Sequence, residues 1–239
     1  SPLYDPTAQV AGPEGVYLYP PPFVLLALPF ALLEVGAASM VWITASLLAF
    51  GLGVLVMPVS TGARWATVLL AGLSWPFVYA VKLGQVGPLL FLLFALAWRW
   101  LERPTVVGVA AALGTVVKLQ PAVLFGWAIV QRRWTVLVAG LASLAVLALV
   151  ALPVTGLSAW SDYVSLLSRV SDPIATPHNF TPGAVAYQAG IAPDVASIVQ
   201  LASTVLALSA VALAAWRCSP DASFLVAVVA SQLISPVLW

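Results

Sequence analysis

Five segments of this chain are long, apolar and free of charged residues, and they limit the possible folds more than any other feature. A helix that crosses the hydrocarbon core of a bilayer needs about 20 mostly apolar residues, and roughly 17 to 25 are tolerated. The segments that meet this requirement are residues 37–57, 65–81, 134–152, 195–216 and 223–239. Because the bilayer core offers no water to pair with backbone groups, such segments become helices. The sequence therefore predicts an all-α, polytopic transmembrane bundle.

The composition agrees with a membrane protein and excludes several other classes. Of the 239 residues, 62% are hydrophobic and 7% are charged, whereas soluble domains have about 45–50% and about 25%. The formal net charge of +1 leaves no basic footprint for nucleic acid. The single cysteine, Cys218, excludes an internal disulfide and a Cys-rich metal site. We therefore expect no nucleic-acid partner, no metal and no cofactor.

Three shorter apolar runs lie between the long ones, at residues 86–98, 105–117 and 119–130. At about 1.5 Å of rise per residue, each covers only ~20 Å of a hydrocarbon core that is ~30 Å thick. We expect these helices to be tilted or to be joined by turns that dip into the membrane. Together with the long segments they give eight predicted crossings.

Arginine residues predict which connections face the cytoplasm, because Lys and Arg accumulate in short cytoplasmic loops. Four alternate connections carry arginine with a tryptophan beside it: Arg64, Arg99 with Arg103, Arg132 with Arg133, and Arg217. We expect these corners to be cytoplasmic. The connections at 82–85, 118–121 and 156–194 then lie on the outer side.

The whole chain is predicted to be a single transmembrane domain, residues 1–239. Its parts are an outer segment with a short interfacial helix at 1–36, six spans over 37–155, an outer loop at 156–194 and two spans over 195–239. Residues 20–34 hold four prolines, which favour a short broken helix at the outer face over a full crossing. A crossing there would leave every later assignment unchanged.

The outer loop at 156–194 contains an amphipathic pattern. Leu157, Trp160, Val164 and Leu167 fall on one helical face, and serines and charged residues fall on the opposite face. Such a pattern is typical of a helix that lies in the membrane interface.

Ionisable groups at a membrane edge are costly, so they are candidates for function. The outer-side elements that stand out are Lys82 with Gln85, Lys118 with Gln120, and His178 with Asn179. Two lysines on the side where basic residues are scarce favour an anionic ligand, since an ammonium binds phosphate well. The alternative is that both lysines extend to the interface and that His178 is a solvated loop residue. Asp5 and Glu14 could each act as a general base or be plain loop acids.

A set of short motifs occurs in a fixed order along nearly the whole chain. They are Pro2-Leu3-Tyr4-Asp5-Pro6, Tyr19-Pro20-Pro21 leading to Leu28-Pro29, Gly84-Gln85-Val86-Gly87, Val117-Lys118-Leu119-Gln120-Pro121 followed by Arg132-Arg133-Trp134, His178-Asn179, and Ser235-Pro236-Val237-Leu238-Trp239. This ordered set resembles glycosyltransferase family 87 of the GT-C superfamily, whose members include polyprenyl-phosphate-mannose-dependent α-mannosyltransferases.

The resemblance implies a GT-C-type hexosyltransferase in a prokaryotic cell membrane. Such an enzyme would move a sugar, mannose in the characterised members, from a lipid-linked polyprenyl-phosphate donor to a hydroxyl of a glycolipid or glycan acceptor at the extracytoplasmic face. Its partners would be these substrates and the membrane lipids.

The resemblance also implies roles for individual residues. It places the donor phosphate near Lys118, and the further substrate-binding candidates are Gln85, His178, Asn179, Tyr19 and Lys82. The family's catalytic acid, expected just after its first span, would precede Ser1, and the fragment would lack it. Asp5 corresponds to a loop on the substrate side, so no catalytic residue is assigned.

A transporter or channel is the main alternative, because broken helices near the membrane midplane are also expected there. Transporters often show paired repeats and acidic residues within spans. No repeat is visible in this chain, and no Asp or Glu falls within a predicted crossing. A glycosyltransferase is therefore favoured over a transporter and over a third class, a non-catalytic membrane scaffold.

Overall fold

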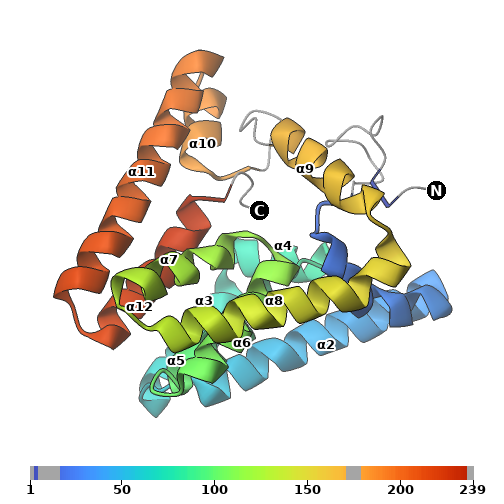
Figure 1. Cartoon of the computed structure of the whole chain (residues 1–239), viewed down its shortest axis with the longest axis horizontal. Coiled ribbons are helices and arrows are strands. Elements are labelled where there is room, and N and C mark those ends of the chain that lie inside the picture. Colours follow the sequence, from blue (N-terminus) through green and yellow to red (C-terminus); the bar gives the residue numbers. More distant parts are fainter. Residues whose placement is uncertain (1–2, 5–16, 171–178, 236–239) are drawn as a thin grey trace.

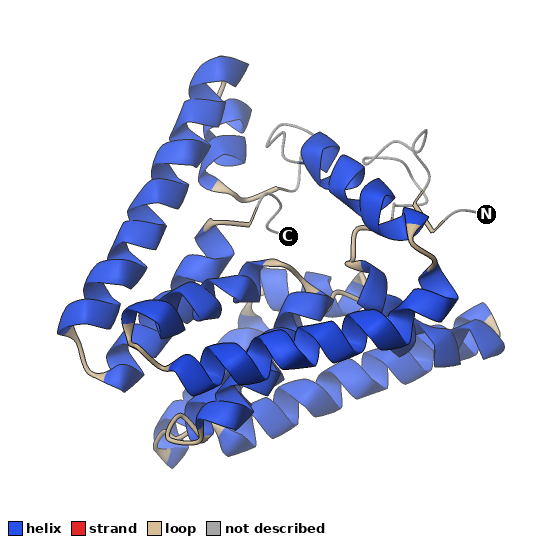
Figure 2. Cartoon of the chain, viewed as in Figure 1, coloured by secondary structure: helices blue, strands red, loops and turns tan. Residues whose placement is uncertain are grey.

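The computed structural model of the chain describes residues 3–4, 17–170 and 179–235. These residues form helices and the turns between them, and none of them forms a strand (Figure 2). The all-α prediction is therefore confirmed for the described part of the chain. The candidates Asp5, Glu14 and His178, and residues 236–239 of the last predicted span, lie outside the described residues.

The described residues form mainly α-helices, whose arrangement Figure 1 shows, together with short 3-10 helices (η) near the start of the chain and at Gln120–Ala122. Their order is η1 (Pro21–Phe23), α1 (Val24–Ala27), η2 (Leu28–Leu32), α2 (Val35–Val56), α3 (Thr61–Leu73), α4 (Trp75–Lys82), α5 (Gly87–Arg99), α6 (Pro104–Val117), η3 (Gln120–Ala122), α7 (Val123–Val130), α8 (Trp134–Thr155), α9 (Ser158–Val170), α10 (Pro182–Gln188), α11 (Pro193–Arg217) and α12 (Pro220–Leu233). The short, proline-broken helix expected at 20–34 is present as η1, α1 and η2.

One predicted helix, at residues 65–81, is divided into two. Helices α3 and α4 meet at Ser74 with a bend of 68°. Pro76 explains the break, because proline lacks a backbone N–H and its ring crowds the carbonyl one turn earlier. Ser74 begins the second helix by accepting a hydrogen bond from the backbone N–H of Phe77 at 3.3 Å.

Three helices of the described chain are long and apolar enough to cross a membrane, namely α2, α8 and α11, and the bent pair α3–α4 gives a possible fourth. Helices α5, α6 and α12 and the η3–α7 pair are apolar but shorter. Helix α12 ends at Leu233 after 14 residues, so it is shorter than the predicted span at 223–239. The count of eight crossings stays a prediction.

The main hydrophobic core lies around α6, which packs against α5 and α8. Glycine allows the approach of α6 to α8, because a Cβ atom at Gly108 would clash with the backbone oxygen of Val136. A Cβ atom at Gly140 would likewise clash with the ring of Phe125. Small residues that bring helix backbones together are typical of membrane bundles.

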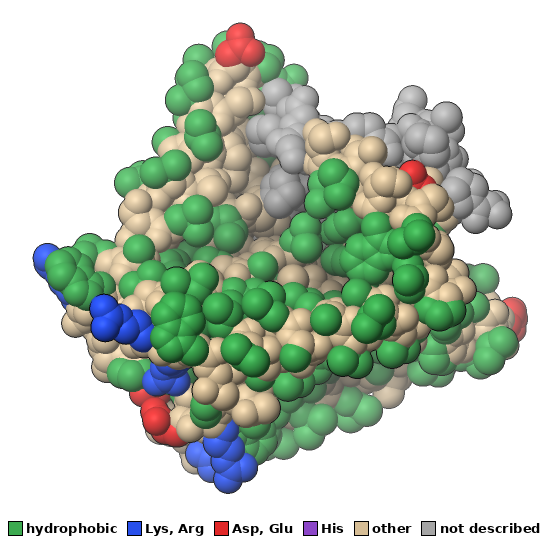
Figure 3. All heavy atoms as spheres, viewed as in Figure 1, with side chains coloured by type: hydrophobic (Ala, Val, Ile, Leu, Met, Phe, Trp, Pro, Cys, Tyr) green, Lys and Arg blue, Asp and Glu red, His purple; other side chains and the backbone are tan. Residues whose placement is uncertain are grey.

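The arginine corners gather at one end of the molecule, where blue side chains cluster in Figure 3. Arg133 donates a hydrogen bond to the backbone oxygen of Leu101 at 2.7 Å, which links the corner before α8 to the corner before α6. The indole of Trp98 donates to a carboxylate oxygen of Asp221 at 2.9 Å, which adds the corner between α11 and α12. Three of the corners predicted to be cytoplasmic therefore contact one another.

Helix α9 lies towards the opposite end, above α8 in Figure 1. Its buried face consists of Ala159, Tyr163 and Leu166, which pack with Tyr4. Of the predicted apolar face, Leu157, which precedes the helix, and Val164 are exposed, whereas Trp160 and Leu167 are half-buried and Leu167 packs against this cluster. The predicted amphipathic helix is thus present. Its face of Ala159, Tyr163 and Leu166 packs on the N-terminal segment at Tyr4.

Candidate functional site

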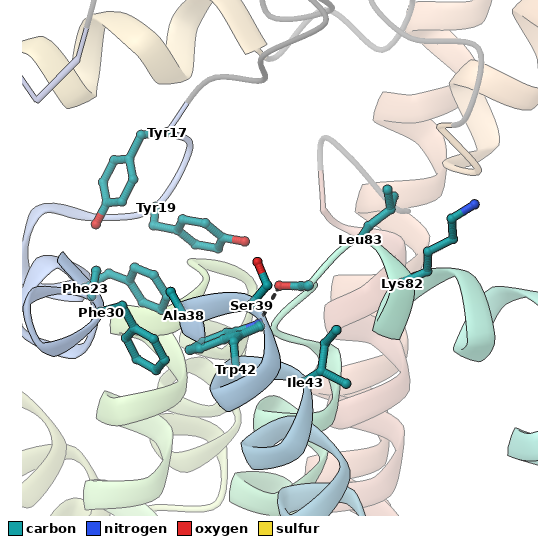
Figure 4. A pocket seen from close by; sticks show the side chains of 12 residues that line it. Tyr17, Tyr19, Phe23, Phe30, Ala38, Ser39, Trp42, Ile43, Lys82 and Leu83 are labelled. Atoms are coloured by element: carbon teal, nitrogen blue, oxygen red, sulfur yellow. Dashed lines mark hydrogen bonds between the residues drawn. The ribbon is translucent and has the colours of Figure 1, made fainter. Parts of the chain in front are cut away.

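A pocket of about 420 Å³ opens between the η1–η2 segment, the start of α2 and the end of α4 (Figure 4). It lies at the start of α2, at the opposite end of that helix from the Arg64 corner. The residues that line it are Tyr17, Tyr19, Phe23, Ala27, Phe30, Ala38, Ser39, Trp42, Ile43, Lys82, Leu83 and Gly84. The lining is therefore mainly aromatic and aliphatic, and Lys82 is its charged member.

Aromatic rings build one side of the pocket. The rings of Tyr19 and Phe23 stack with centroids 4.3 Å apart, and Tyr17 meets Tyr19 edge-on at 5.6 Å. Trp42 contacts Phe30 edge-on at 5.4 Å. Stacked and edge-to-face pairs are the favourable ring geometries. The wall is thus a connected aromatic cluster that joins the N-terminal segment to α2.

Helix α4 ends in a glycine turn that forms the opposite side of the pocket. Gly84 has a φ of +66°, a left-handed conformation that favours glycine. The backbone N–H groups of Gly84 and Gln85 donate to the carbonyls of Val81 and Ala80 at 3.1 and 2.8 Å. This pair of bonds is a Schellman motif, which ends a helix and satisfies its last carbonyls. It also fixes the position of Lys82, the last residue of α4, at the pocket.

Trp42 attaches this turn to α2. Its indole N–H donates to the carbonyl of Gly84 at 2.7 Å, drawn as a dashed line in Figure 4. In the same view Lys82 is on the far side of the pocket from Tyr17 and Tyr19, and its ammonium points away from the rings. The pocket therefore presents an apolar interior with a cation at its rim.

Two tyrosine hydroxyls at the pocket are neutral hydrogen-bond donors. Burial raises the pKa of Tyr17, with the neighbouring Tyr19 adding to the effect, and burial also raises the pKa of Tyr19. The Tyr17 hydroxyl is buried and has no hydrogen-bond partner among the described residues. The hydroxyl of Tyr4 donates to the backbone oxygen of Tyr19 at 2.6 Å. This bond holds the segment that contains Tyr19 in place.

The second lysine, Lys118, ends α6 on the same side of the protein. Its backbone N–H donates to Gly114 at 2.8 Å, and its side chain is half-buried. Burial lowers the pKa of Lys118 to about 8. The preceding Val117 belongs to one buried cluster with Val86 and Phe23. Val86 directly follows Gln85, and Phe23 lines the pocket. The two lysine turns therefore flank one apolar cluster beneath the pocket.

A family model of glycosyltransferases, described as glycosyltransferase family 87, matches residues 17–236. The chain belongs to glycosyltransferase family 87. The matched residues include every lining residue of the pocket and both lysine turns. No curated protein and no solved structure matches the chain.

Membership of family 87 confirms the resemblance seen in the sequence motifs and makes the protein a membrane glycosyltransferase. Nothing in the comparisons supports the transporter or channel alternative. Of the predicted substrate-binding residues in this glycosyltransferase, the structure brings Tyr19 and Lys82 into one pocket and puts Gln85 and Lys118 beside the cluster below it.

Asn179 is not among the residues that line the pocket, and it makes local hydrogen bonds at the start of α10. Its side-chain oxygen accepts from the backbone N–H of Thr181 at 3.1 Å, and its backbone oxygen accepts from Gln188 at 2.8 Å. Side-chain oxygens of Asn commonly pair with the backbone two residues on. Asn179 is buried and does not line the pocket, and it helps to hold the start of α10.

Sequence reasoning missed Trp42, Phe30 and Phe23 as site residues of this family 87 glycosyltransferase. A usable signal existed for Trp42, because a tryptophan near the end of a membrane span is typical of the membrane interface. Phe23 and Phe30 carry no comparable signal, since apolar residues in an apolar run are ordinarily core.

Proposed function

We propose that this protein transfers a hexose, specifically mannose, from a polyprenyl-phosphate donor to a hydroxyl of a glycolipid or glycan acceptor at the extracytoplasmic face of a prokaryotic cell membrane. The observation that carries the proposal is the aromatic pocket with Lys82 at its rim and Lys118 on the same side. An isoprenoid chain is apolar and suits an aromatic pocket, whereas its phosphate needs a cation. A lipid-linked phosphate combines both requirements in one molecule.

In this reaction the acceptor oxygen attacks the anomeric carbon while the bond from that carbon to the phosphate oxygen breaks. The leaving polyprenyl phosphate gains negative charge, so a cation near it stabilises the transition state more than the ground state. We assign this role to Lys118. Lys82, Gln85 and Tyr19 would contact the same donor at the pocket.

The acceptor hydroxyl must also lose a proton to a base. The described lining residues of the pocket include no carboxylate. We therefore place the base outside the pocket lining. Tyr17 and Tyr19 are neutral at the ordinary tyrosine pKa of 10.0 and burial raises that pKa further, so they would act as donors to oxygen atoms of the substrates.

A transfer assay with the intact protein in nanodiscs tests the donor class. Radiolabelled mannose supplied as polyprenyl-phosphate mannose should pass to an acceptor fraction extracted from membranes, and nucleotide-linked mannose should give no transfer. Lys118→Met protein of normal fold should transfer slowly, because the leaving phosphate loses its cation. Transfer from the nucleotide sugar alone would overturn the proposed donor.

A further inference from the structure

A pair of glutamines buried between η3 and α12 forms a polar site separate from the aromatic pocket. Gln120 begins η3, two residues after Lys118, and its side chain is buried. Its amide nitrogen donates to the side-chain oxygen of Gln232 on α12 at 3.1 Å. Gln232 in turn donates to the hydroxyl of Ser231 at 3.0 Å. Two helical elements 112 positions apart along the chain are therefore joined by their amides.

Gln120 has an unused hydrogen-bonding atom at this site. Its side-chain oxygen is buried and has no partner among the described residues. A buried polar atom without a partner is destabilising, so such an atom is commonly paired when the protein is in its working state. If both amides were turned over, the bond between Gln120 and Gln232 would survive in the opposite direction, and Gln120 would present an N–H instead.

A sugar hydroxyl is the ligand group that fits either arrangement, because a hydroxyl both donates and accepts. A carboxylate only accepts and an ammonium only donates, so neither matches both. The site is also close to Lys118, the residue proposed to bind the phosphate. Residues two apart, such as Lys118 and Gln120, have Cα atoms at most about 7 Å apart, which is comparable to the width of one sugar ring.

We propose that Gln120 and Gln232 form a hydroxyl-binding subsite for the transferred sugar, whose phosphate lies at Lys118. The proposal rests on the proposed function, since it assumes a lipid-phosphate sugar donor. A site built to pair with a substrate hydroxyl discriminates against an analogue that lacks it, because the protein group is then left unpaired. Gln120 and Gln232 would therefore set sugar specificity, a role distinct from binding the lipid.

Deoxy donors test the subsite. The full protein in nanodiscs would be assayed with polyprenyl-phosphate mannose and with its monodeoxy analogues at C2, C3, C4 and C6. Wild-type protein should use one of these analogues with kcat/KM lower by about 10- to 100-fold, the range expected for one unpaired buried polar group. In Gln120→Met and in Gln232→Met protein, transfer of mannose should fall and the discrimination should shrink to within about 3-fold.

Gln200→Met is the matched control. Gln200 lies on α11 near the end of α12, but its amide groups already pair, with the backbone oxygen of Leu233 at 3.3 Å and with the backbone N–H of Gly183 at 3.0 Å. This variant should lose stability while keeping the wild-type discrimination.

Three outcomes separate the proposals. Equal use of all analogues by the wild type would overturn the subsite alone. A water molecule would then be the hydrogen-bond partner of the Gln120 oxygen. Undiminished discrimination in folded Gln120→Met and Gln232→Met proteins would do the same. Failure of the wild type to use any polyprenyl-phosphate donor would overturn the proposed function and the subsite with it.

Discussion

The indole N–H of Trp42 donates a 2.7 Å hydrogen bond to the backbone oxygen of Gly84 and so joins α2 to the turn after α4. The two residues are 42 positions apart. Gly84 is in a left-handed conformation, and a Cβ atom there would lie 3.3 Å from the indole carbon Cδ1 of Trp42. This contact fixes the distance between the aromatic wall of the pocket and Lys82 at its rim.

Replacing Trp42 by Phe should loosen the turn that carries Lys82. The variant keeps a ring against Phe30 but leaves the Gly84 oxygen without its donor, and one such bond contributes about 0.5–1.5 kcal/mol. We expect a several-fold rise in KM for the lipid-linked donor with a small loss of thermal stability in detergent. Trp65→Phe is the control, because Trp65 is exposed beside the Arg64 corner. Equal KM values for the two variants would contradict a positioning role for Trp42.

Replacing Gly84 by Ala should destabilise the same turn through the backbone. A side chain in a left-handed conformation costs about 1–2 kcal/mol, and the new methyl group would press on Trp42. The midpoint of thermal unfolding should fall together with donor affinity. Gly126→Ala in α7 is the matched control, because nothing lies within 4 Å of its added Cβ and alanine favours a helix by about 1 kcal/mol. A stabilised Gly84→Ala protein would show that the turn is not under this constraint.

Replacing Lys118 by Met should slow transfer without unfolding the protein. A charged hydrogen bond to phosphate contributes about 1.5–3 kcal/mol, which corresponds to roughly a 10- to 150-fold loss in kcat/KM. Lys118→Arg should rescue the rate only partly, because a planar guanidinium does not replace a point charge in a tight turn. Lys82→Met, with an exposed side chain at the rim, should be milder. If Lys82→Met were the more damaging change, the phosphate contact would be assigned to Lys82 at the pocket rim and not to Lys118.

The activity should fall as the pH rises through about 8, because the pKa of Lys118 in the folded protein is about 8. The ammonium that binds the donor phosphate is present below this pH and is lost above it. Since kcat/KM reports the pKa of the free enzyme, a plot of kcat/KM against pH should show this limb, and Lys118→Met should lack it. Between about 8 and the ordinary value of 10.5, the unfolded chain holds a proton that the folded chain has released. The contribution of Lys118 to the free energy of unfolding therefore increases with pH in that window.

Cysteine labelling should place the arginine corners and helix α9 on opposite sides of the membrane. In a Cys218→Ser background, Glu102→Cys should react with an impermeant maleimide only after the inner side is opened, and Ser158→Cys should react from outside. Both positions are exposed in the structure, so failure to label would not reflect burial within the protein. Labelling of both positions from one side would refute the predicted orientation.

The sequence by itself determined the helices, because membrane helices are decided by local apolarity and length. The described part of each of the eight predicted apolar runs falls on helical structure, although Pro76 divides one of them and α12 is short. It also indicated Lys82 and Lys118 as residues of interest, since charged groups are conspicuous in such a chain, and the family resemblance added Tyr19.

Only the tertiary structure decided how these residues meet. The stacking of Tyr19 on Phe23, the bond from Trp42 to Gly84 and the amide pair of Gln120 with Gln232 depend on how helices pack, and the last pair spans 112 positions. An apolar run carries no mark of which face turns towards a partner, because nearly all of its residues are equally apolar and either face can be turned to lipid or to protein. Packing therefore decided the pocket, and it also gave Asn179 its place at the start of α10.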